Sequence, residues 1–281
     1  MGDLERDEIL DMLTLAEFAG RMSRMSLTAP DPQRLGGLAW ARRTGGRLSR
    51  AERRRLLAAI AVGQWQNIVG RAKLALGRLP EAAGHVDVDT FQVPDSKFAR
   101  EAEEACAELP PALEGHSYRT WLFGSALATV DGNKLDDELF YCGALLHDYG
   151  IVNPAANRDF TLGSVDRMLA AASAAGLAEQ HANLLADGIC VHTTPGVNVD
   201  TDGVIGCYLQ WGAMVDGAGL RMWDIARGNV QEILRRYPRG NFKRELVDMM
   251  RAEAAAVPGG RFGLLVRCGL PLAVRMAPFD S

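Results

Sequence analysis

The chain has 281 residues, of which 48% are hydrophobic and 23% are charged. These values are typical of a soluble globular protein and exclude a disordered, collagen-like or mucin-like chain. The formal net charge of -4 argues against a protein whose main role is to coat nucleic acid. No apolar run approaches the roughly 18 residues of a membrane-spanning helix, and the acidic first residues do not resemble a secretory signal. We therefore predict a cytoplasmic protein that binds neither nucleic acid nor membrane.

Helical patterns begin near the N-terminus. Apolar residues at three- and four-residue spacings predict an amphipathic helix over residues 4–25. Ser49 and Glu52 form the signature of a capping box, which predicts a second helix that bends or ends near Gly63 and resumes as helix up to Pro80. Residues 84–94 are polar and β-branched, and they predict an extended connection or one short strand.

Helices also dominate the rest of the chain. They are predicted over residues 97–108, 112–129, 136–148, 161–175, 177–192 and 204–216. Gly and Pro separate these segments, and Gly150 stands where a left-handed helix cap is expected. Since alanine and leucine dominate between the breaks, the expected fold class is all-α, mainly helical.

The predicted organisation is one helical domain over residues 1–281, because no internal repeat or long linker divides the chain. Within it we expect an N-terminal helical extension over 1–92, a core over 93–225 and a C-terminal helical and loop segment over 226–281.

Four residues form a candidate metal site. His147 directly precedes Asp148 at the end of an apolar helix, where burying an ionisable pair is unfavourable unless something compensates it. A divalent cation would compensate it, and the partial negative charge of a helix C-terminus favours a cation. His116 and Asp216 also lie on apolar elements. Two imidazoles and two carboxylates suit a metal with open positions for water and substrate, although a buried hydrogen-bonded network is the alternative.

This pattern resembles the HD superfamily of metal-dependent hydrolases, whose signature is a histidine, a later His-Asp doublet and a distant aspartate on a helical bundle. The closer similarity is to its cyanamide-hydratase-like branch, and it covers about residues 93–217. Ile151 stands where HD-type cyclic dinucleotide phosphodiesterases carry Lys, which disfavours that activity. The segments that carry the resemblance are Val-Pro-Asp-Ser at 93–96, Pro-Pro-Ala-Leu at 110–113, His-Ser-Tyr-Arg-Thr-Trp-Leu-Phe-Gly at 116–124, Ala-Leu-Leu-His-Asp-Tyr-Gly at 144–150 and Val-His-Thr-Thr-Pro-Gly at 191–196.

Two further residues are candidate catalytic groups. Arg119 lies one turn after the first histidine and would anchor the substrate or hold a ligand carboxylate; a surface ion pair is the alternative. His192, at a helix end, is a candidate general acid, substrate contact or extra ligand, against a structural histidine. His181 is expected to be structural, because eleven residues of helix span about 16 Å. His85 is expected to be solvated, with a place in a flexible flap over the site as the alternative. The basic run over 42–55 is expected to be a solvated helix start, with an acidic or phosphate partner as the alternative.

The leading hypothesis is an HD-fold enzyme that binds one divalent ion and adds metal-activated water to a small molecule. Zinc is favoured, with iron or manganese as alternatives. The resemblance implies a cyanamide- or nitrile-like substrate. The second hypothesis is a phosphohydrolase acting on a nucleotide or other phosphoester, in which Arg119 would hold a phosphate oxygen. The third is a non-catalytic metal-binding regulatory protein. The oligomeric state, including a homo-oligomer, is left open.

Overall fold

The computed structural model describes residues 34–280, and within that range the protein is built from helices. Thirteen α-helices and several 3-10 turns are present, with no strand among these residues. The predicted all-α class is therefore confirmed. The helix predicted over residues 4–25 lies outside the described residues. No helix in the described range combines the length and the apolar character that a membrane crossing requires.

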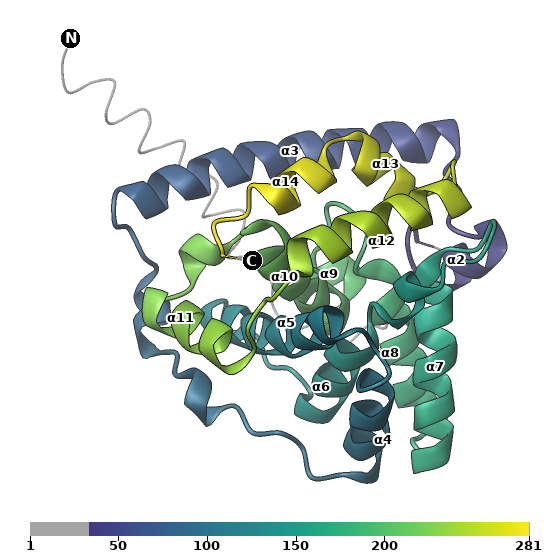
Figure 1. The fold of residues 1–281 in the computed structure, drawn as a ribbon, viewed down its shortest axis with the longest axis horizontal. Coiled ribbons are helices and arrows are strands. Elements are labelled where there is room, and N and C mark those ends of the chain that lie inside the picture. Colours follow the sequence, from purple (N-terminus) through teal and green to yellow (C-terminus); the bar gives the residue numbers. More distant parts are fainter. Residues whose placement is uncertain (1–33, 281) are drawn as a thin grey trace.

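The elements alternate with short connections (Figure 1). The α-helices are α2 (Leu38–Thr44), α3 (Arg50–Ala75), α4 (Lys97–Cys106), α5 (Pro111–Val130), α6 (Asp137–Leu146), α7 (Phe160–Ala175), α8 (Glu179–Val191), α9 (Val199–Asp202), α10 (Val204–Ala218), α11 (Arg227–Arg236), α12 (Phe242–Ala256), α13 (Arg261–Arg267) and α14 (Leu270–Arg275). The 3-10 helices are η1 (Glu81–His85), η2 (Val88–Thr90), η3 (Tyr149–Val152) and η4 (Met222–Asp224).

The long helix α3 begins as the sequence predicts. The Ser49 hydroxyl accepts a hydrogen bond from the Glu52 amide at 3.3 Å, and the Glu52 carboxylate accepts one from the Ser49 amide at 2.7 Å. This reciprocal capping box satisfies two amides that the first turn leaves without partners. The predicted bend or end near Gly63 is wrong, because α3 continues unbroken to Ala75. A single glycine among good helix formers weakens a helix without breaking it.

The connection over 84–94 contains 3-10 turns rather than a strand. In η2, the Asp87 carboxylate accepts a hydrogen bond from the Asp89 amide at 2.9 Å. Polar side chains that hydrogen-bond to nearby backbone favour turns, and the described residues contain no strand with which this segment could pair.

The centre of the fold is an antiparallel contact between α5 and α10. A Cβ atom on Gly212 would lie 2.3 Å from the Thr120 carbonyl oxygen, and one on Gly124 would lie 2.7 Å from the Tyr208 carbonyl oxygen. Only glycine permits backbones to approach this closely. One turn beyond Gly212 on α10 is Asp216. Asp216 contacts His116, which lies one turn before Thr120 on α5. The glycine contact therefore sets the distance between these two residues.

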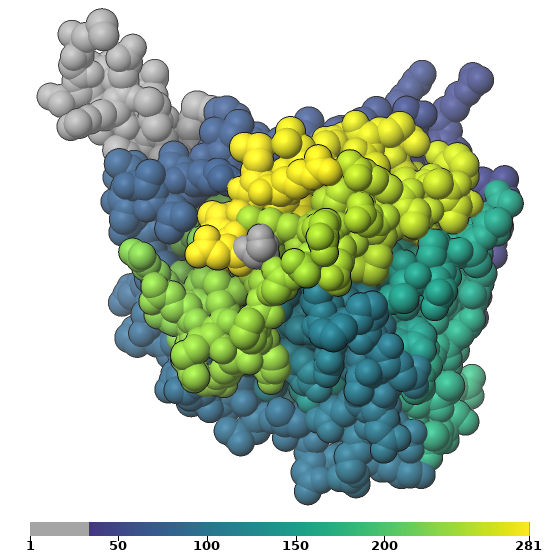
Figure 2. Space-filling view, in the orientation of Figure 1, coloured from purple at the N-terminus to yellow at the C-terminus, as the bar shows by residue number. Residues whose placement is uncertain are grey.

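The other helices surround this pair. Helix α6 packs against α5 and α4, while α8 packs against α10 and α7. On the side that faces the viewer, α12 packs against α13 and α5. Figure 2 shows that the chain from α11 to the C-terminus forms a continuous surface on this side of the molecule.

Gly150 does not form the left-handed cap that its position predicts. It lies in η3 with an ordinary backbone conformation. A Cβ atom on Gly150 would lie 2.0 Å from the Phe160 carbonyl oxygen, and its amide donates to the Ser164 hydroxyl at 2.9 Å. The glycine is therefore required for the close approach of η3 to α7.

A buried acid joins α12 to the start of α7. The Glu253 carboxylate accepts a hydrogen bond from the Phe160 amide at 3.2 Å, while its Oε2 atom is buried without a partner. Burial raises the pKa of Glu253 to about 8, and the nearby Asp159 carboxylate contributes in the same direction. Glu253 is thus protonated at neutral pH in the folded protein.

This raised pKa predicts a stability that falls with rising pH. Folding favours the protonated acid, so its contribution is complete below about pH 4.5 and is lost as the pH rises to about 8. We expect Glu253→Gln, which resembles the protonated acid, to match the wild type near pH 4.5 and to exceed its unfolding free energy by on the order of 2–4 kcal/mol at pH 9. Urea unfolding across this range measures the difference. A constant difference at every pH would contradict the assignment.

The helix contact at Gly212 predicts a second stability effect. Gly212→Ala should lower the unfolding free energy by about 1–3 kcal/mol, because the new methyl group would overlap the α5 backbone. Gly217→Ala in the same helix is the matched control, since no atom lies within 4 Å of its added Cβ. The control should gain about 0.5–1 kcal/mol from helix propensity. If urea unfolding gave equal changes for the two substitutions, the close contact at Gly212 would not be what determines the loss of unfolding free energy.

Candidate metal centre

Three histidines and one aspartate converge between the ends of α5, α6 and α8. His116 lies in the second turn of α5. Helix α6 ends at Leu146, so His147 and Asp148 leave it in different directions, and His192 is the C-terminal cap of α8. Two of the three elements therefore present their C-terminal ends, which carry partial negative charge and favour a cation.

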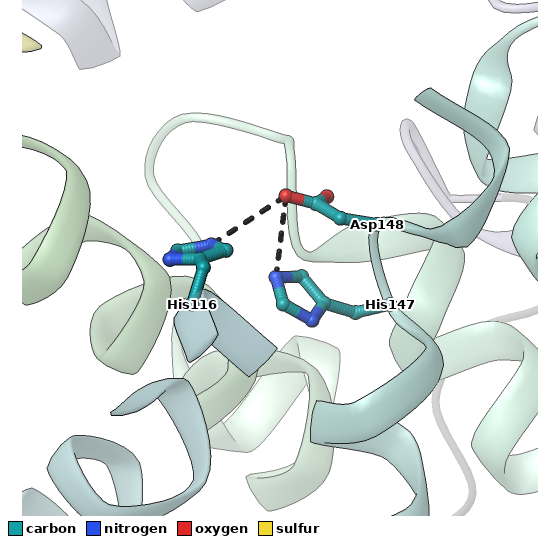
Figure 3. A group of neighbouring side chains, drawn as sticks. All are labelled: His116, His147 and Asp148. Carbon is teal, nitrogen blue, oxygen red and sulfur yellow. Dashed lines mark ion pairs between the residues drawn. The ribbon is translucent and has the colours of Figure 1, made fainter. Parts of the chain in front are cut away.

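The carboxylate of Asp148 is the centre of this cluster. Its Oδ2 atom lies 3.5 Å from His116 Nε2 and 3.4 Å from His147 Nε2, as Figure 3 shows. Its Oδ1 atom lies 3.3 Å from His192 Nε2. His116, His147 and Asp148 each offer one ligand atom, and these atoms all lie within 4.8 Å of one another. These three buried residues could hold a metal ion.

The opposite ring nitrogens are already engaged. His147 Nδ1 donates to the Ala144 carbonyl oxygen at 2.8 Å, and His192 Nδ1 donates to the Ile189 carbonyl oxygen at 2.5 Å. Because a carbonyl oxygen only accepts, both Nδ1 atoms carry the proton. His147 Nε2, which carries no proton in the neutral ring, then directs a lone pair toward Asp148. His147 Nε2 is buried and has no hydrogen-bond partner.

Burial favours the neutral form of the central histidine. Removal from water lowers the pKa of His147 below its ordinary value of 6.5, and this effect exceeds the opposing attraction of Asp148. Two electron-rich groups, a neutral imidazole and a carboxylate, thus face each other in an environment that excludes water. A cation between them would remove this repulsion, and metal-bound histidines commonly donate their other N–H to a carbonyl or carboxylate in this manner.

Asp216 lies on the other side of His116 from Asp148. Its Oδ2 atom is 2.7 Å from His116 Nδ1, and its Oδ1 atom accepts from Arg119 Nε at 2.8 Å and from Arg239 Nη1. Burial alone would raise the pKa of Asp216, but the charge of Arg119 and the bond to His116 outweigh it and hold this pKa below its ordinary value. The structure therefore brings three of the four predicted ligands together, namely His116, His147 and Asp148. The fourth, Asp216, lies where it orients the imidazole of His116.

Arg119 is completely buried, so the alternative of a surface ion pair is wrong. Besides Asp216, its guanidinium contacts the carbonyl oxygens of Tyr237 and Pro238 at 3.1 and 3.3 Å. Space for this group depends on Gly115, where a Cβ atom would lie 2.8 Å from Arg119 Nη1. Of the roles considered from the sequence, holding a carboxylate of the site corresponds to the observed contact.

The C-terminal segment supplies residues that sequence reasoning missed. Arg239 is 3% exposed and also donates to the Asp216 carbonyl oxygen at 2.6 Å. The Phe242 ring stacks on His116 at 4.7 Å, and the guanidinium carbons of Arg119 and Arg239 lie 5.1 and 4.8 Å from its centroid. Cation–aromatic contact stabilises buried guanidinium groups. No local motif marks Arg239 or Phe242, because their partners are distant in sequence.

Gln210 is a second missed residue, and a signal for it was present. Its side-chain amide donates to the carbonyl oxygens of His192 and Thr194 at 2.6 and 2.7 Å, which fixes the segment after α8. Gln210 and Asp216 are polar residues in an otherwise apolar helix. The polarity that distinguishes Asp216 in this helix distinguishes Gln210 as well.

The remaining basic candidates lie away from this cluster. His181 is exposed on α8 and His85 is exposed in η1. The arginines of the basic run are also exposed, and four of them occupy the first two turns of α3. The predicted helix start describes these four, whereas Arg42 and Arg43 lie in the last turn of α2 and Arg47 lies between the two helices.

The different surroundings of the two aspartates predict different stability effects. Asp216→Asn should lower the unfolding free energy by about 3–5 kcal/mol, because it leaves Arg119 and Arg239 buried without a carboxylate. Asp148→Asn, measured in chelator, should cost less than about 1 kcal/mol, because no arginine or lysine contacts Asp148 among the described residues. Urea unfolding of both variants tests this. A larger loss of unfolding free energy in Asp148→Asn than in Asp216→Asn would contradict the conclusion that Asp216 is the aspartate on which stability depends.

Comparison with known proteins gives no match at the level of sequence. No family model fits the chain, and no curated protein shows significant similarity to it.

Proposed function

We propose that this protein is a metal-dependent HD-fold hydrolase or hydratase that adds activated water to a small molecule, with a cyanamide- or nitrile-like substrate as the leading candidate. One observation carries the proposal. Three imidazoles use their Nδ1 atoms in other contacts and direct their Nε2 atoms at the Asp148 carboxylate, at 3.3 to 3.5 Å. Imidazole nitrogen and carboxylate oxygen donors in this arrangement are suited to a divalent cation.

In this proposal His116, His147 and Asp148 hold the ion. Asp216 orients His116 through Nδ1, and His192 lies beside the second oxygen of Asp148, where it serves as a further ligand or as a proton donor. A bound Zn²⁺ would lower the pKa of a coordinated water from 15.7 to about 7. Zinc fits the mixed nitrogen and oxygen donors, and iron and manganese remain alternatives.

The surroundings support a small neutral substrate. Asp148, Thr193 and Thr194 are each less than a tenth exposed, which limits access to small molecules. Phe160 lies 6.1 Å from the His192 ring and Phe242 stacks on His116, so apolar rings flank the cluster. Arginines that would attract a phosphate are instead hydrogen-bonded to Asp216.

A phosphohydrolase is the second candidate, and one observation favours it. Arg119 Nη2 and the Nε and Nη2 atoms of Arg239 are buried without hydrogen-bond partners. Two guanidinium groups that share one carboxylate would accept a second anion, such as a phosphate oxygen, if the site opened toward them. A non-catalytic metal-binding protein is the third candidate.

Metal content tests the proposed ligands. We expect about one divalent ion per chain in the purified protein and loss of that ion in His147→Ala and Asp148→Ala, because each removes a donor from the coordination shell. His181→Ala is the matched control, since it removes an exposed histidine that lies about 16 Å from His192 along α8. Elemental analysis of all four proteins measures the effect. Full occupancy in both ligand variants would refute the assignment.

Turnover assays separate the three candidate functions. The metal-loaded protein should hydrate cyanamide or a simple nitrile, and the same activity should be absent from His147→Ala. Hydrolysis of a generic phosphomonoester without hydration would favour the second candidate. Metal binding without either activity would favour the third.

A further inference from the structure

The outward face of α3 is apolar, although no described residue covers it. Of the 26 residues in this helix, only Leu56 and Gly70 are buried. Exposed apolar residues recur every three or four positions and so form one stripe. The stripe comprises Leu57, Ala61, Trp65, Ile68 and Ala72, followed by Leu76 at the helix end.

This stripe is unusual for the part of the molecule that the structure describes. Seven of the eleven large hydrophobic side chains that are exposed there lie between positions 57 and 79. Trp65, in the middle of the stripe, is 64% exposed and Leu76 is 71% exposed. Helix α3 extends along one edge of the molecule (Figure 1). A contiguous exposed apolar surface of this kind marks a binding site.

The charges that flank the stripe select the kind of partner. Residues 50–79 contain six arginines and one lysine against one acid, Glu52. Arg53, Arg54 and Arg55 are exposed at one end of the stripe, and Arg71 and Arg78 are exposed at the other. The fitting partner is therefore an amphipathic segment with excess negative charge.

We propose that residues 3–17 of the same chain bind this face of α3. This segment carries six carboxylates and a single arginine, Arg6. Its apolar residues recur at three- and four-residue spacings, the same period as the stripe on α3. Apolar contact would cover Trp65 and its neighbours, while the carboxylates would lie near the flanking arginines.

The position at which the chain enters the described part makes this contact accessible. Arg34 is held by Asp187 and Asp202, at 2.6 and 2.8 Å. The loop just before α9 touches α3, because a Cβ atom on Gly196 would lie 2.9 Å from the Ala59 Cβ. The 17 residues from position 17 to position 34 can span up to about 56 Å. Helix α3 is about 39 Å long, so its whole length lies within reach.

A second copy of α3 is a less suitable occupant. Its seven basic groups would face seven others in either helix orientation, and like charges that are brought together repel. An anionic membrane surface matches the charge but leaves the acidic segment without a role. Both occupants are distinguished from the proposed one in the experiment below.

Acrylamide quenching of Trp65 fluorescence tests the proposal in the full-length protein. The difference between the wild type and Trp65→Phe isolates the signal of this residue from the other four tryptophans. We expect the Trp65 quenching constant to rise at least threefold in the variant D7N/E8Q/D11N, and the amides of α3 to exchange hydrogen faster. The triple substitution D95N/E104Q/E179Q removes the same charge from exposed sites elsewhere and should leave both readouts unchanged.

Three results would overturn the proposal. The first is equal quenching of Trp65 in the wild type and in D7N/E8Q/D11N. The second is protection that increases with protein concentration, which would indicate a second copy. The third is protection that appears only with vesicles containing phosphatidylserine, which would indicate a membrane surface. Metal content and turnover are expected to be the same in all variants, so this test is independent of the proposed function.

Discussion

The buried carboxylate of Asp216 is the interaction on which the centre of the molecule depends. It lies on α10, and two other parts of the chain direct polar groups at it: α5 supplies His116 and Arg119, and the C-terminal segment supplies Arg239. A buried charge is tolerated only when it is paired, so these contacts must form together. The same carboxylate fixes the orientation of His116, which links the stability of the core to the geometry of the candidate metal centre.

Asp148, on the other side of His116, has a different kind of partner from Asp216. Asp148 faces histidines rather than arginines, and two of these histidines have their Nδ1 protons committed to backbone carbonyls. Asp216 is therefore paired with two arginines, whereas Asp148 is surrounded by imidazoles. This contrast is the physical basis for separating Asp216, which orients His116, from Asp148, which belongs to the group that could hold a metal ion.

Much of this arrangement could be predicted from the sequence, and the failures have physical causes. The capping box at Ser49 and the helices that carry His116 and His147 depend on local signals, so they were predicted close to their observed bounds. Asp216 was identified by its polarity in an apolar helix, but its partners were not, because Arg239 meets it only through the tertiary fold. Gly150 was misinterpreted because a glycine required for backbone contact and one required for a left-handed turn have the same local sequence.

The contribution of the C-terminal segment has a consequence for how the protein matures during synthesis. A nascent chain that has left the ribosome only as far as α10 already contains the cluster, which is His116, His147, Asp148 and His192, together with Asp216. It lacks Arg239, which neutralises Asp216, and Phe242, which covers the His116 ring. The buried pairing of Asp216 and the stacking on His116 are thus completed only when the start of α12 has been translated.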